Sequence, residues 1–205
     1  MINPPVLNPR PGLILSFLGG WVAMLLLSAL LFLAPVLGFP FIDIPHLIGG
    51  IFCDSPTLAF WLGFWINFAV GVFIFAPALS FLWPMLPGPG VGFRGAILRG
   101  ILWGLVLWVL SGILLPLFAA LNKLGADVVQ SPGPFAIATG ARGFVALLGG
   151  HLVYGLALAL VATMGDGILP LDTIGWPGYL KAEVPPGHLL GREERLPEYP
   201  PVGVR

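Results

Sequence analysis

The apolar run at residues 144–164 constrains this chain more than any other part of its sequence. It reads FVALLGGHLVYGLALALVATM and contains no Asp, Glu, Lys or Arg. A helix rises about 1.5 Å per residue, so a run of this length can cross the roughly 30 Å hydrocarbon core of a bilayer. If the helix begins near Ala141, His151 lies close to the membrane midplane, where a polar ring needs a hydrogen-bonding partner or a cofactor.

The composition extends this interpretation to the whole chain. Hydrophobic residues make up 58% of the 205 residues and charged residues only 9%, whereas soluble domains have about 25% charged residues. The formal net charge is zero, which indicates neither a nucleic-acid partner nor a polybasic arm for binding a membrane surface. The single cysteine, Cys53, excludes an intrachain disulfide, and the sequence leaves its role open.

The apolar intervals and the breaks between them predict an all-α membrane protein with four transmembrane helices in a bundle. We expect the spans at residues 13–37, 58–83, 96–121 and 141–164. Together they form a four-helix transmembrane domain at residues 1–164. Ser55 and Pro56 are typical of the start of a helix, and Pro77 predicts a kink near the end of the second span.

The two halves of this domain resemble each other weakly. When the second half is aligned on the first, Asn67 falls on His151 and Gly71 falls on Gly155. One hypothesis is a duplicated helical hairpin, with the two copies related by an axis along the membrane normal. The alternative is chance similarity in an apolar alphabet. If the duplication is real, we expect Asn67 and His151 to face each other near the centre of the bundle.

The candidate site residues are therefore the midplane polar residues Asn67, His151 and Tyr154. One interpretation is that they bond to one another or to a backbone carbonyl and stabilise the packing. The other is that His151 binds the iron of a haem or the magnesium of a chlorin. Membrane haem normally takes two ligands from spans, and His151 is the only one of the three histidines inside a predicted span. We therefore predict no bound cofactor and keep His151 as an alternative cofactor ligand.

Neither a catalytic site nor a metal site is predicted. Asp43, His46, Cys53 and Asp54 follow one another without a recognised ligand spacing. The sequence has no HExxH motif and no phosphate-binding loop, and all nine acidic residues lie outside the predicted spans. This pattern disfavours an enzyme and an ion pump, whereas a passive channel remains an alternative.

Small residues indicate where helices approach each other closely. Gly100 and Gly104 form a GxxxG pair in the third span, and Gly155 and Ala159 have the same spacing in the fourth. Such residues let two helix backbones come together. We expect these four residues to pack within the chain, and contact with a second copy is the alternative.

Lys and Arg residues beside the spans predict the orientation. One side of the membrane collects Arg10, Arg94, Arg99 and Lys181, and the other collects Lys123 and Arg142. We expect Arg94 and Arg99 to anchor the third span in the head-group layer. The positive-inside rule then places both termini in the cytoplasm of a bacterial cell.

The segment at residues 165–205 is too polar to span a membrane and too rich in proline to form a long helix. We expect an extended cytoplasmic tail. Its apolar side chains Trp176, Tyr179 and Leu180 are candidates for docking onto a partner protein.

Three stretches carry a resemblance to a known family: LLFLAPVLGFPFIDIP, LRGILWGLVLWVLSGILLPLF and LLGGHLVYGLALAL. Residues 13–164 are similar to an uncharacterised bacterial family of small four-span membrane proteins, the YagU-like inner-membrane proteins. The most particular shared element is the spacing of His151, Tyr154 and Gly155. The resemblance implies a four-helix membrane fold. Since some similar proteins accompany respiratory oxidases, it also implies an energy-transducing complex.

The sequence therefore predicts a non-catalytic accessory subunit of a bacterial energy-transducing complex, with a respiratory oxidase or related electron-transfer complex as the first candidate. Its expected partners are lipids and other integral membrane subunits, and its expected location is the inner membrane. The alternatives are a passive channel or small-solute carrier using Asn67 and His151, and a haem- or chlorin-binding subunit.

Overall fold

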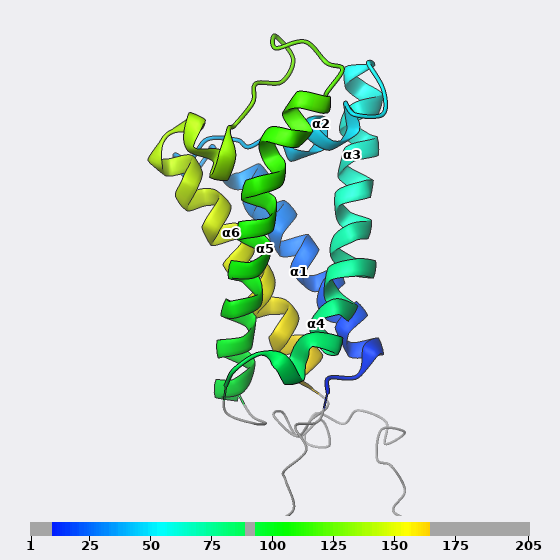
Figure 1. Ribbon diagram of the computed structural model, residues 1–205, viewed down its shortest axis with the longest axis vertical. Coiled ribbons are helices and arrows are strands. Elements are labelled where there is room, and N and C mark those ends of the chain that lie inside the picture. Colours follow the sequence, from blue (N-terminus) through cyan, green and yellow to red (C-terminus); the bar gives the residue numbers. More distant parts are fainter. Residues whose placement is uncertain (1–9, 89–92, 165–205) are drawn as a thin grey trace, which may run out of the picture. The chain divides into compact units, whose positions relative to one another are not determined.

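The structure, a computed structural model, describes residues 10–88 and 93–164, and all regular structure in these residues is helical (Figure 1). Four helices are long and apolar enough to cross a membrane, namely Leu13–Leu33, Pro56–Met85, Phe93–Leu121 and Ala141–Ala162. The all-α fold with four candidate spans is therefore confirmed, and no end differs from its expected position by more than four residues. The mutual packing of all four spans as a bundle stays a prediction. The expected tail at residues 165–205 lies outside the described residues.

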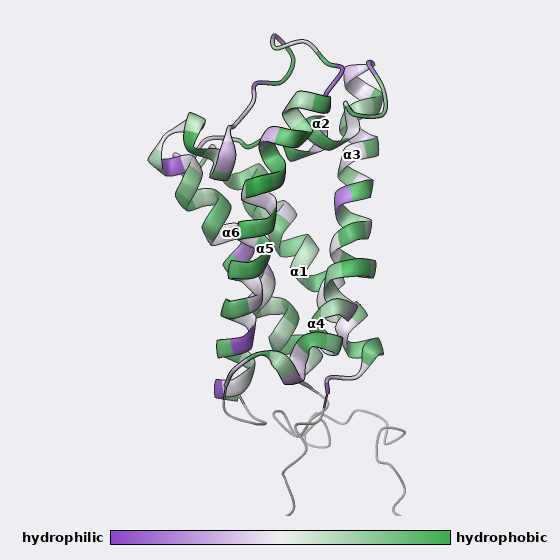
Figure 2. Cartoon of the chain, in the orientation of Figure 1, coloured by the Kyte–Doolittle hydropathy of each residue, from purple (hydrophilic) through white to green (hydrophobic). Residues whose placement is uncertain are grey.

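The candidate spans contain several distinct helical elements. In chain order the elements are α1 (Leu13–Leu33), α2 (Ile44–Gly49), α3 (Pro56–Val70), η1 (Gly71–Phe75), α4 (Ala76–Leu82), η2 (Trp83–Met85), α5 (Phe93–Leu121), η3 (Pro134–Thr139) and α6 (Ala141–Ala162). The second span is thus assembled from α3, η1, α4 and η2 in series. Figure 2 shows that hydrophilic residues gather mainly in the loops and at the helix ends, with few along the helices.

Pro77 accounts for the break inside the second span. A proline has no backbone N–H, and its ring clashes with the carbonyl four residues earlier. The chain responds with the π-helical turn η1 directly before α4, in which the Ala76 N–H donates to the Gly71 carbonyl. The kink predicted from Pro77 therefore takes the form of one wider helical turn.

α6 packs closely against both α1 and α5. α1 also packs against η1 and α4, whereas α3 packs mainly against α2. Between α1 and α3 the contact is made by aromatic rings: Phe32 meets Phe60 and Phe64, and Trp21 meets Phe68. α3 therefore contacts the rest of the chain through α2, through η1 and through these aromatic rings.

α2 is a short helix that joins α3 to the end of α5. A Cβ on Gly63 would overlap the Pro45 carbonyl, so the backbones of α2 and α3 touch. The Asp43 side chain caps α2 by accepting a hydrogen bond from the His46 N–H at 3.2 Å. At the other end, Asn122 Nδ2 donates to the carbonyls of His46 and Leu47, at 2.8 and 3.1 Å. These bonds fix α2 between two spans.

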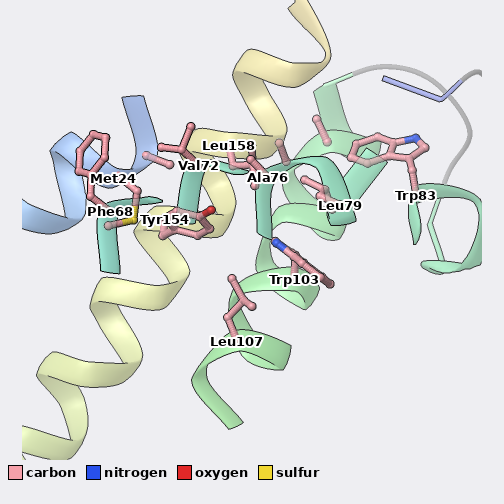
Figure 3. Close-up of a cluster of buried hydrophobic side chains, with 13 residues drawn as sticks. Met24, Phe68, Val72, Ala76, Leu79, Trp83, Trp103, Leu107, Tyr154 and Leu158 are labelled. Atoms are coloured by element: carbon pink, nitrogen blue, oxygen red, sulfur yellow. The ribbon is translucent and has the colours of Figure 1, made fainter. Parts of the chain in front are cut away.

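The buried side chains form two clusters. The first joins α1, the second span, α5 and α6 around Tyr154, which lies among Met24, Phe68, Val72 and Leu158 (Figure 3). The second cluster joins α2, α5, η3 and α6 near the opposite end of the spans, and α3 contributes no residue to it. Space therefore remains beside α3.

Candidate functional site

A cavity of about 590 Å³ occupies the space between α3 and the group formed by α1, α5 and α6, with α2 bounding one end. Its wall is almost wholly apolar. The four polar side chains that line it are Asn67, Ser111, His151 and Tyr154, and no charged residue is among the lining residues that the structure describes. The volume falls in the range of about 300–1,000 Å³ that is typical of small-molecule sites.

The cavity is elongated along the spans. On α1 it extends from Met24 past Leu33, the last residue of that helix, a distance of roughly 14 Å at 1.5 Å per residue. One end is lined by Asn67, His151 and Tyr154, and the other end lies beneath α2. The cavity is not sealed, because Leu37, Phe52 and Val145 line it and are 62%, 58% and 51% exposed.

His151 is half-buried on α6, and its Nδ1 lies 2.8 Å from the carbonyl oxygen of Leu147 one turn earlier. Because a carbonyl only accepts, Nδ1 must carry the proton that is donated in this bond. A neutral ring in this tautomer keeps Nε2 as an acceptor. The ring therefore has one hydrogen-bonding atom engaged by its own helix and one that is available.

Tyr154, one turn further along α6, has its hydroxyl proton engaged in a hydrogen bond. Its hydroxyl donates to the Gly71 carbonyl at 2.6 Å, and the side chain is buried. Gly71 begins the π-helical turn, and its carbonyl also accepts from Ala76. Tyr154 thus joins α6 to the second span at the point where Pro77 has altered the helix.

Asn67 is half-buried on α3. Its side chain makes no hydrogen bond to any residue in the described part of the chain. Asn67 and His151 line the same cavity from opposite helices, but no hydrogen bond joins them. From the sequence alone, Asn67, His151 and Tyr154 could bond to one another or to backbone carbonyls. In the structure, His151 and Tyr154 bond to backbone carbonyls.

The four small residues meet where α5 crosses α6. A Cβ on Gly100 would lie 2.8 Å from the Gly155 carbonyl and 3.0 Å from the Ala159 methyl group. A Cβ on Gly104 would press against the His151 carbonyl. The two backbones therefore touch, and the residue that carries the imidazole is held at the contact. The predicted docking residues Trp176, Tyr179 and Leu180 lie outside the described residues.

Sequence reasoning missed the surroundings of Arg99. The Arg99 side chain is fully buried. Its Nε donates to the Leu86 carbonyl at 3.2 Å, and its guanidinium carbon lies 4.7 Å from the centroid of the Trp83 ring. A cation over an aromatic face contributes about 0.5–2 kcal/mol. The available signal was that Trp83 and Arg99 flank the same interhelical connection.

His46, which has no recognised metal-ligand spacing to its neighbours in the sequence, lies on α2. Its Nδ1 lies 2.7 Å from the Asp43 carboxylate, so this pair belongs to the helix cap. Across residues 10–88 and 93–164, no three His, Cys, Asp or Glu side chains lie close enough together to hold a metal ion.

Comparison with known proteins found no matching family model, no matching curated protein and no matching solved structure.

Proposed function

We propose that this chain is a non-catalytic accessory subunit of a bacterial energy-transducing membrane complex, with a respiratory oxidase or related electron-transfer complex as the first candidate. The non-catalytic role is supported by the hydrogen bonds that polar side chains within the spans make to the backbone. Tyr154, His151 and Ser111 each bond to a backbone carbonyl of this chain, at 2.6, 2.8 and 3.1 Å. Such bonds stabilise helix packing and leave no acid, base and nucleophile arranged together.

The incomplete packing around α3 supports a role within a larger assembly. Trp61 and Trp65 on this helix are 54% and 57% exposed, and α3 packs mainly on α2. A helix such as α3, which has little contact with the rest of its own chain, has surface left for a neighbouring subunit or for lipid. The respiratory assignment and the inner-membrane location with cytoplasmic termini rest on the resemblance to YagU-like proteins and on the distribution of Lys and Arg.

Co-purification tests this proposal. The full chain, tagged and expressed at its native level, is extracted from its own membranes in a mild detergent and weighed by native mass spectrometry. We expect a complex with other integral subunits in fixed stoichiometry. As a control, an unrelated four-span protein with the same tag should not recover these subunits. Isolation of the chain as a lone monomer or homo-oligomer would contradict the proposal.

The second candidate is a small-solute carrier that uses Asn67 and His151. The unbonded Asn67 amide in the cavity favours this function. The apolar wall opposes passage of ions, since a charged solute would lose its hydration without a counter-charge. Flux through liposomes that contain this protein alone, abolished in His151→Leu, would decide for the carrier. A haem or chlorin band in the absorption spectrum of the purified protein would instead decide for the cofactor-binding alternative.

A further inference from the structure

The cavity beside α3 combines a long apolar wall with two unused hydrogen-bonding groups. Asn67 has a free amide, with both donors and an acceptor, and His151 has Nε2 beyond its bond to Leu147. Both residues line the end of the cavity that is remote from α2, whereas the lining of the rest of its length is apolar except for Ser111. A ligand that fits this pattern has one small polar end and a hydrocarbon body.

We propose that the cavity binds a neutral, single-chain lipid with a hydroxyl group at one end, which lies between Asn67 and His151. The absence of charged lining residues in the described part of the chain selects a neutral ligand, because burying an ion without a counter-charge is costly. The length of roughly 14 Å along α1 suits an extended hydrocarbon chain. The exposed lining residues Leu37, Phe52 and Val145 leave the cavity accessible.

The hydroxyl is selected by the two polar groups together. A hydroxyl group donates one hydrogen bond and also accepts, so it can donate to His151 Nε2 and accept from Asn67 Nδ2. A carbonyl could only accept, which would leave the imidazole nitrogen without a donor. An alkane would leave both groups without a partner. The remaining polar lining residues, Ser111 and Tyr154, already donate to the carbonyls of Trp108 and Gly71.

Photocrosslinking tests the proposal on the full chain, purified alone in lipid nanodiscs. The probe is hexadecan-1-ol with a diazirine in its chain, and mass spectrometry maps the labelled residues. We expect saturable labelling of cavity-lining residues on α3 and α6, competed by unmodified hexadecan-1-ol. Asn67→Leu should weaken the apparent affinity about three- to tenfold, the effect of losing one hydrogen bond in an apolar site. The matched control Thr139→Ala should leave it unchanged, since that hydroxyl is bonded to the Ala136 carbonyl and lies outside the cavity.

A second variant blocks the cavity without removing a polar group. Gly149 lines the cavity, and a Cβ there would meet no atom within 4 Å. Gly149→Leu should therefore abolish saturable labelling, while Gly12→Leu, also at an open position but outside the cavity, should not change it. Both variants can be checked for monodispersity by size-exclusion chromatography before labelling.

Three outcomes would overturn the proposal. Uniform labelling of lipid-facing residues would show that there is no specific site. Equal saturation by a hexadecane probe without the hydroxyl would show that Asn67 and His151 do not select the ligand. Equal competition by phosphatidylcholine would assign the cavity to ordinary bilayer lipid. Because the protein is tested alone, this result is independent of whether the chain is an accessory subunit.

Discussion

Gly155 lets α5 and α6 approach until their backbones touch. A Cβ at this position would overlap the Gly100 carbonyl and would lie 2.6 Å from the Gly104 nitrogen. Backbone atoms cannot turn aside as the end of a flexible side chain can, so Gly155→Ala should lower the free energy of unfolding by about 1–3 kcal/mol. Reversible unfolding in mixed micelles, followed by tryptophan fluorescence, measures the change.

The matched control for that change is Gly149→Ala, on the same helix. A Cβ at Gly149 meets nothing within 4 Å, and alanine is favoured over glycine in a helix interior by about 1 kcal/mol. This variant should be unchanged or slightly more stable. Equal destabilisation by both substitutions would show that the backbone contact at Gly155 does not decide the effect.

At the residue level, the sequence can show where small side chains repeat but cannot show which polar groups meet. The spacing of Gly100 and Gly104 predicts a close helix contact because it depends only on the helical period. The bond from Asn122 to His46 joins residues 76 positions apart. The position of Arg99 under Trp83 likewise depends on the turn of the chain between them. Local patterns contain no information about such pairs.

At the level of elements, α2 depends on Asn122 at the end of α5. Its amide donates to two carbonyls of α2, and its Oδ1 accepts from the Leu124 N–H at 2.8 Å. Asn122→Ala leaves these groups without partners, at an expected cost of about 1–3 kcal/mol. Hydrogen exchange should become faster at residues 46–53 and stay unchanged in α6. Asn67→Ala is the control, since Asn67 has no hydrogen bond among the described residues. A similar increase in the exchange rate at residues 46–53 in this variant would count against the role of Asn122.

The long helices could be predicted because their length and apolarity are set by the bilayer itself. The π-helical turn η1 could not be predicted, because Pro77 indicates a break in the helix but does not specify which hydrogen bonds the neighbouring carbonyls then accept. The sequence also did not predict η3, in which Phe135 and Ala136 have φ values of 52° and 57°. This rarely populated conformation coincides with the contact of the Phe135 ring with Trp108, whose ring centroid lies 4.8 Å away. The cavity beside α3 depends on how the helices pack against one another, which their length and apolarity do not specify, so it could not be predicted from the sequence.

At the scale of the whole membrane domain, the connections α1–α3 and α5–α6 meet at the same end of the spans (Figure 1). The Lys123 N–H donates to the Gly50 carbonyl at 2.8 Å, and Asn122 bonds to α2 beside it. The second span and α5 are connected at the other end of the spans. If the four helices cross the bilayer, Cys53 and Ser131 must therefore face one aqueous phase and Met85 the other.

Cysteine labelling tests this arrangement, and the chain is suited to it because Cys53 is its only cysteine. The native chain is compared with Ser131→Cys and Met85→Cys, each made in a Cys53→Ser background; Ser131 is exposed, and Met85 is 77% exposed. A membrane-impermeant maleimide is added to intact cells and to inverted vesicles. We expect the native chain and Ser131→Cys to react from the same side and Met85→Cys from the other. If the prediction from Lys and Arg is right, the side shared by Cys53 and the Ser131→Cys variant is the external one. Reaction of Cys53 and the Met85→Cys variant from the same side would mean that Pro56–Met85 does not cross the membrane, which would contradict the four-span arrangement.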